Sequence, residues 1–147
     1  MASKREAALL ALTAALAPLG TGTRKVERNA TLPEKLPADG LIVVRDGAPG
    51  APVETYLASP PVYVFEHRAE IELVVQKTTQ PERDSALDAL LVSIGPLIAA
   101  DRTLGGAVDY AEHLAAEPLD VTVEGGLPLK GATVPVVLHY DTQDPLG

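Results

Sequence analysis

Residues 62–77 read VYVFEHRAEIELVVQK, and residues 79–100 read TQPERDSALDALLVSIGPLIAA. The first stretch alternates apolar and charged side chains, a pattern typical of a strand with one buried and one polar face. The second stretch repeats apolar residues at helical spacing. A long strand followed by a long amphipathic helix indicates a sheet that is covered by a helix on one face.

Within the strand, one parity is mainly apolar and the other mainly charged. The apolar parity holds Tyr63, Phe65, Ala69, Ile71, Leu73 and Val75, and the polar parity holds Glu66, Arg68, Glu70, Glu72 and Gln76. His67 interrupts the apolar parity. We expect it to be a hydrogen-bonded structural histidine near a solvated end of the strand, rather than a metal ligand.

The helix after this strand has a clear start and an ambiguous end. Thr79 and Glu82 form a capping box, and Pro81 suits the first turn. The core-facing stripe is Leu87, Leu90, Leu91, Ile94, Leu97 and Ile98. Gly95-Pro96 is expected to kink or break the last turn, because proline has no backbone N–H to donate.

A shorter helix is predicted at the N-terminus. Ser3 and Glu6 form its capping box, leucines follow at helical spacing, and Pro18 and Gly20 end it. A secretory signal is the alternative, disfavoured because Glu6 interrupts the apolar run. Residues 20–40 are predicted to form an extended, partly mobile arm or loop.

The remaining strands carry weaker signals. We expect a central strand at 41–45, a return strand at 54–58, a strand at 119–124 and a last strand at 132–140, with 107–117 ambiguous between loop and short helix. Pro135 favours an edge position or a bulge for the last strand. Residues 141–147 are expected to be a frayed tail.

These elements predict one α+β domain over residues 1–147: a mostly antiparallel sheet of about four or five strands, with two main helices packed on one face.

The composition excludes several classes of function. The chain has no cysteine, which excludes disulfides and thiol catalysis. Its formal net charge of −8 disfavours nonspecific nucleic-acid binding. No apolar run is long enough to span a membrane.

Catalytic motifs are sparse. The chain has no nucleophile elbow and no glycine-rich phosphate loop. The best catalytic hypothesis combines His139 with Asp141, and with Asp101 and Asp109, as a general base oriented by a carboxylate. The three histidines, His67, His113 and His139, are too far apart for short metal-ligand spacing. We therefore predict no catalytic, cofactor-binding or metal-binding residues.

The string Asp101-Arg102-Thr103-Leu104-Gly105-Gly106 has two compatible interpretations. In the structural one, Asp101 or Thr103 caps a turn, Leu104 fills the core and the glycines reverse the chain. In the functional one, this exposed corner contacts a neighbouring subunit, so Asp101, Arg102 and Thr103 are interface candidates.

The order of these features, over roughly residues 6–141, resembles the tail terminator (tail completion) proteins of long-tailed phages and gene transfer agents. The string Asp101–Gly106 is the most family-like part. The resemblance implies a lambda-type fold and a structural virion protein, assembled in the host cytoplasm. Such proteins form a ring, typically a hexamer, on the head-proximal end of the tail tube. They stop polymerisation of the tube protein and join the tail to the head-side connector.

A ring of this kind suggests roles for two strands. If the last strand is an edge strand, a neighbour can pair with it, which makes Val134, Val136 and Tyr140 interface candidates. The acidic residues Glu66, Glu70 and Glu72 are candidates to face the lumen, where they would repel DNA and let it pass without sequence-specific binding.

Three alternatives remain open. The chain is another neck or tail-tube ring component, a small acyltransferase- or hydrolase-like enzyme that uses His139, or a free-standing regulatory binding domain.

Overall fold

The computed structural model describes residues 2–33, 35–119 and 128–147. Its order is α1 (Lys4–Leu16), the 3-10 turn η1 (Ala17–Leu19), β1 (Lys25–Arg28), β2 (Leu41–Ala48), β3 (Glu54–Tyr56), β4 (Val62–Gln76), α2 (Gln80–Ala100), β5 (Tyr110–His113), β6 (Glu117–Leu119) and β7 (Leu129–Thr142). In these residues the sheet has seven strands, in the order β1-β2-β4-β7-β5, with β3 paired to β4 and β6 paired to β7. The α+β class is therefore confirmed.

The sheet is mixed, because β1 lies parallel to β2 while the other described pairs are antiparallel. It has more strands than the predicted four or five. The predicted return strand at 54–58 is present as β3. The strands that the sequence did not predict, β1 and β5, have four residues each, and this length leaves almost no periodic signal. Residues 110–113, ambiguous in the sequence, form β5, and the predicted strand at 119–124 lies mostly outside the described residues.

Both helices pack on one face of the sheet and share one core, as predicted. Leucines of α1 and α2 meet the apolar parity of β4 and the matching residues of β7. The N-cap bond of each predicted capping box forms: the Ser3 hydroxyl accepts the Glu6 amide at 3.1 Å, and the Thr79 hydroxyl accepts the Glu82 amide at 3.4 Å. The amphipathic pattern thus determines which layer each element joins.

Helix α2 continues beyond Gly95-Pro96 to Ala100, so the expected break is wrong. The last turn is retained because Leu97 is partly buried and Ile98 is fully buried in the core. Tertiary packing of this turn outweighs the backbone bond that Pro96 cannot make.

Residues 20–40 do not form a free arm. They include β1, and the loop after it folds across the other face of the sheet, where Leu36 is buried with Leu41, Val43 and Val74. The Lys77 ammonium donates to the Ala38 carbonyl at 3.0 Å, which ties this loop to the end of β4. The expectation of a mobile connection missed these long-range contacts.

Arg28 links β1 to α1 and β2. Its guanidinium donates to both carboxylate oxygens of Glu6, at 2.6 and 2.9 Å, and to both of Asp46, at 2.8 and 2.9 Å. These bonds lower the pKa of the Glu6 and Asp46 carboxyls. A planar guanidinium between two carboxylates sets the position of α1 against the sheet.

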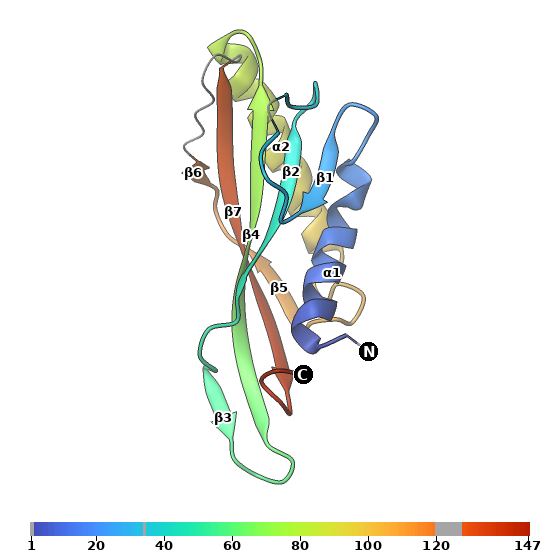
Figure 1. Ribbon diagram of the computed structural model, residues 1–147, viewed down its shortest axis with the longest axis vertical. Helices are drawn as coiled ribbons and strands as arrows, with labels where there is room; N and C mark the ends of the chain where they lie inside the picture. Colours follow the sequence, from blue (N-terminus) through green and yellow to red (C-terminus); the bar gives the residue numbers. More distant parts are fainter. Residues whose placement is uncertain (1, 34, 120–127) are drawn as a thin grey trace.

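Beyond the helical layer, β4 and β7 continue together and carry β3 at their far end (Figure 1). We call residues 53–62, which comprise β3 and its connection to β4, the β3 hairpin. Strand β7 ends at Thr142, whose hydroxyl donates to the carbonyls of Asp144 and Gly147. The C-terminal residues therefore form a hydrogen-bonded turn rather than the expected frayed tail.

Candidate functional site

The sheet face opposite the helices presents the charged parity of β4, and we call it the open sheet face. The strand register places on it Arg45, Glu66, Arg68, Glu70, Glu72, Tyr110, Glu112, Glu117, Thr133, Pro135, Val137 and His139. Five of these are carboxylates and two are guanidiniums. The face is consequently acidic, in keeping with the formal net charge of −8.

Two ion pairs neutralise part of this acidity. Arg45 Nε lies 3.0 Å from Glu72 Oε2, and Arg68 Nη2 lies 3.4 Å from Glu117 Oε1. Glu66 is exposed and Glu70 partly exposed, and neither makes an ion pair within the described part of the chain. The lumen candidates Glu66, Glu70 and Glu72 therefore share one face, but the charge of Glu72 is already paired with Arg45.

His139 also lies on the open sheet face, where its nearest acid is Glu112. The His139 Nε2 atom is 3.7 Å from Glu112 Oε2, and its ring meets the Tyr110 ring edge-on at a centroid distance of 6.2 Å. Asp141 is exposed and follows on the same strand, paired in register with Val64. Among the described residues, the His139 side chain forms no ion pair with Asp141, Asp101 or Asp109, and Asp109 meets it only through the backbone, where its amide donates to the His139 carbonyl at 2.8 Å. The predicted combination is therefore not assembled.

The corner Asp101–Gly106 has the predicted structural role. The Asp101 carboxylate accepts the Thr103 amide at 3.2 Å, the Thr103 hydroxyl at 2.9 Å and the Gly105 amide at 2.7 Å. These bonds, first of all the one from Thr103, lower the Asp101 pKa. Leu104 is buried, and Gly105 and Gly106 have positive φ angles of 71° and 90°.

The corner also borders an apolar groove between the two helices. Asp101 and Thr103 are exposed, whereas the Arg102 guanidinium donates to the Ala111 carbonyl at 3.1 Å and stacks over the Tyr110 ring at 5.2 Å. The groove has a volume of about 450 Å³ and is lined by Ala11, Ala14, Ala15, Leu97, Asp101, Leu104 and Gly105. We call it the interhelical groove.

The expectation that β7 is an edge strand is wrong. Strand β7 pairs with β4 on one side and with β5 and β6 on the other. Val134, Val136 and Tyr140 are buried in the subunit's own core, so their side chains cannot serve as the predicted contact with a neighbour. Pro135 is tolerated where β7 changes partner from β6 to β5, and there its carbonyl accepts the Leu114 amide at 2.9 Å.

His67 is a satisfied structural histidine, as predicted, but it lies in the core rather than at a solvated strand end. Its Nε2 is 2.6 Å from the Asp46 carbonyl oxygen, and its Nδ1 is 2.9 Å from the Tyr140 hydroxyl. Because a carbonyl only accepts, Nε2 carries the proton, and the Tyr140 hydroxyl donates to Nδ1. Burial lowers the His67 pKa and raises that of Tyr140 to about 12.

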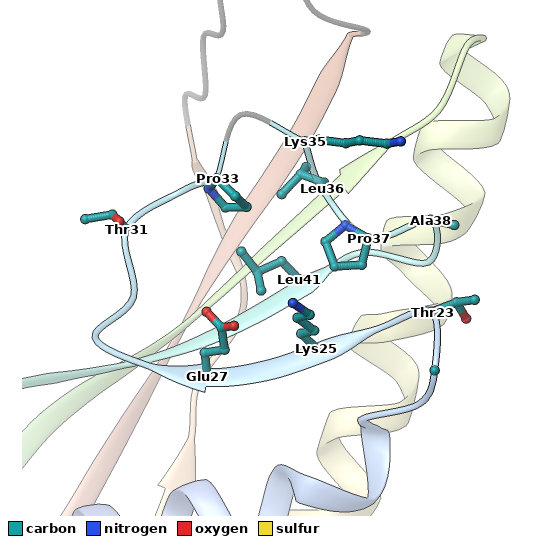
Figure 2. A pocket seen from close by; sticks show the side chains of 11 residues that line it. Thr23, Lys25, Glu27, Thr31, Pro33, Lys35, Leu36, Pro37, Ala38 and Leu41 are labelled. Carbon is teal, nitrogen blue, oxygen red and sulfur yellow. The ribbon is translucent and has the colours of Figure 1, made fainter.

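A second hollow lies between β1 and the loop residues 31–33 and 35–38, with a volume of about 410 Å³. Lys25 and Glu27 rise from β1 toward the apolar side chains of Leu36 and Leu41 (Figure 2). Lys25 has no ion-pair partner among the described residues. One lysine beside one glutamate defines no particular chemistry, and we assign this hollow no function.

Sequence reasoning missed the exposed apolar residues of the β3 hairpin. Val53, Tyr56 and Leu57 are 51%, 56% and 84% exposed, and β3 is exposed along its whole length. The available signal was the absence of any Lys, Arg or His between Arg45 and His67, in a stretch that holds apolar residues and several prolines. From the sequence alone, this stretch indicates only a turn and a return strand.

Within the described residues, no group of three or more His, Asp and Glu side chains is arranged to hold a metal ion. No described helix combines the length and apolar character that crossing a membrane requires. Neither the known family models nor the curated proteins include a match to this sequence.

Proposed function

We propose that this chain is a ring-forming structural protein of a phage or gene transfer agent: a tail terminator, typically a hexamer. It caps the head-proximal end of the tail tube, stops polymerisation of the tube protein and joins the tail to the head-side connector. The proposal rests on the resemblance carried by the order of elements and by Asp101–Gly106. A subunit whose sheet has one face covered by helices and one open, acidic face is compatible with a ring-forming role.

The open sheet face is the observation that supports the proposal best. Both helices lie on the opposite face, so Glu66 and Glu70 are left uncovered on a continuous strand. In a ring with this face turned inward, carboxylates would repel the DNA phosphates and keep the passing DNA from binding. The helices and the corner at Asp101 and Thr103 would then be available to neighbouring subunits.

Electron microscopy of particles from a strain that lacks this gene tests the proposal. Overlong tails, or tails without heads, are the expected result, and expression of the gene from a plasmid should restore normal particles. Normal particles in the deletion strain would overturn the tail terminator function. A His139→Ala variant is the matched control, because a structural role predicts normal assembly and DNA transfer, whereas an enzyme that depends on His139 would lose its function.

A further inference from the structure

The β3 hairpin presents apolar side chains to water at a place where they do nothing for the subunit's own core. Tyr56 and Leu57 belong to neither buried cluster, and the hairpin projects beyond both helices (Figure 1). Exposed apolar residues gathered on one projecting element are typical of a contact with another molecule.

The charges of the hairpin restrict the kind of partner. Glu54 is its single charged residue, and its carboxylate accepts a hydrogen bond from the Tyr56 hydroxyl at 2.6 Å. With no basic residue between Arg45 and His67, the hairpin has nothing to pair with phosphates of DNA or acidic lipids. The partner surface should be apolar and weakly charged.

The interhelical groove of the same chain has this character. Alanines of α1, Leu97 of α2 and Leu104 of the turn after α2 line it, and its single charged residue is Asp101. The Asp101 carboxylate already accepts bonds from Thr103 and Gly105 within its own turn. The groove is therefore an apolar hollow whose bordering charge needs no partner from outside.

From this complementarity we infer that the β3 hairpin of one subunit binds in the interhelical groove of a second copy, with Tyr56 and Leu57 against the alanines of α1. Two different patches of one chain then meet, which makes the contact heterologous, as ring closure requires. The inference rests on the proposed ring and names its interface. It also brings the corner at Asp101 and Thr103 to the edge of that interface.

Site-directed cross-linking tests the contact directly, because the chain has no native cysteine. In a Leu57→Cys/Ala14→Cys double variant, a short bismaleimide should produce a ladder of covalent oligomers up to the full ring. Each single variant should stay uncross-linked. Cross-linking of Leu57→Cys alone would indicate a two-fold contact between hairpins and would overturn the inference.

Weakening the contact gives a second readout. Leu57→Ser, or Ala14→Glu in the groove, should raise the protein concentration needed for ring formation by about tenfold or more, measured by mass photometry. Val92→Ser is the matched control, because Val92 is an exposed apolar residue of α2 that does not line the groove, and it should leave assembly unchanged.

The outcomes separate this inference from the proposed function. If wild-type protein forms no oligomer, alone or in particles, both are overturned. If Leu57→Ser forms full rings at the wild-type concentration, only the hairpin contact is overturned. Full rings that no longer join tail tubes would assign the hairpin to the tube protein instead, which also overturns the contact between copies.

Discussion

At the residue scale, His67 connects three strands through two hydrogen bonds. It lies on β4, accepts from Tyr140 on β7 and donates to the Asp46 carbonyl on β2, where the register between β2 and β4 shifts. A buried imidazole costs little free energy when both nitrogens have partners, but it is sensitive to the loss of either one.

Tyr140→Phe should lower the free energy of unfolding by about 1–3 kcal/mol, because the buried Nδ1 of His67 is left without a donor. Urea denaturation followed by circular dichroism measures the change. Tyr63→Phe serves as the control, since Tyr63 has no hydrogen bond among the described residues, and it should change stability by less than about 0.5 kcal/mol. Equal effects of the two variants would contradict the His67–Tyr140 bond.

The lowered pKa of His67 predicts a loss of stability in mild acid. The unfolded chain takes up a proton near the ordinary pKa of 6.5, whereas the folded chain resists it, so the free energy of unfolding falls as pH drops below 6.5. Glu6, Asp46 and Asp101, whose pKa values are lowered, contribute stability that is lost only below their ordinary values of 4.5 and 3.8.

Unfolding measured between pH 7 and about pH 5 should therefore show a slope that His67→Gln removes. Val92→Ser, an exposed substitution that removes no titratable group, is the control and should keep the wild-type slope. A wild-type slope retained in His67→Gln would assign the pH dependence to other groups.

At the element scale, two glycines with opposite environments test how the backbone of α2 and β2 is constrained. Gly95 lies within α2, and a β-carbon added there would meet His113 Nε2 at an ordinary 3.5 Å. Gly47 lies in β2 with a φ of +60°, and a β-carbon added there would come within 2.0 Å of the Arg68 carbonyl oxygen.

Gly95→Ala should raise the free energy of unfolding by about 0.5–1 kcal/mol, because alanine loses less backbone entropy than glycine in a helix. Gly47→Ala should lower it by about 2 kcal/mol or more, since both the positive φ and the close carbonyl oppose a side chain. Thermal unfolding of the two variants measures both effects. A loss of stability in Gly95→Ala would indicate that the helix is distorted near Pro96.

At the scale of the whole molecule, the distribution of charge over the two faces matters most. The helices cover one face, and the acidic residues of β4 remain on the other, with only part of their charge neutralised. If the open sheet face lines a channel for DNA, its sign of charge governs passage more than it governs folding.

Glu66→Lys should leave particle assembly and subunit stability unchanged, because Glu66 is exposed and makes no ion pair within the described residues. DNA delivery should fall by about tenfold, since a ring of lysines would attract the phosphates. Counts of particles and of delivered genomes measure the two effects. Asp88→Lys, on the exposed side of α2, is the control; an equal loss in both variants would place Glu66 away from the channel.

Much of the fold follows from the sequence alone, because its signals are local. Period-two alternation in residues 62–77, the two capping boxes and the leucine stripes each act within a few neighbouring residues, and they determine β4, α1, α2 and the shared core. The turn at Asp101–Gly106 is equally local. The resemblance to tail terminators, carried by the order of these elements, remains the basis of a proposal.

Only the tertiary structure decided where each strand lies in the sheet and which side chains remain exposed. Pro135 favoured an edge, yet β5 and β6 pair with β7 on either side of that proline and bury Val134 and Val136. His67 found its partners 21 and 73 residues away. The apolar residues of the β3 hairpin stayed exposed because the helices end short of it (Figure 1). The physical reason is that edges, buried polar pairs and exposed patches depend on strand pairing between distant segments, which no local pattern encodes.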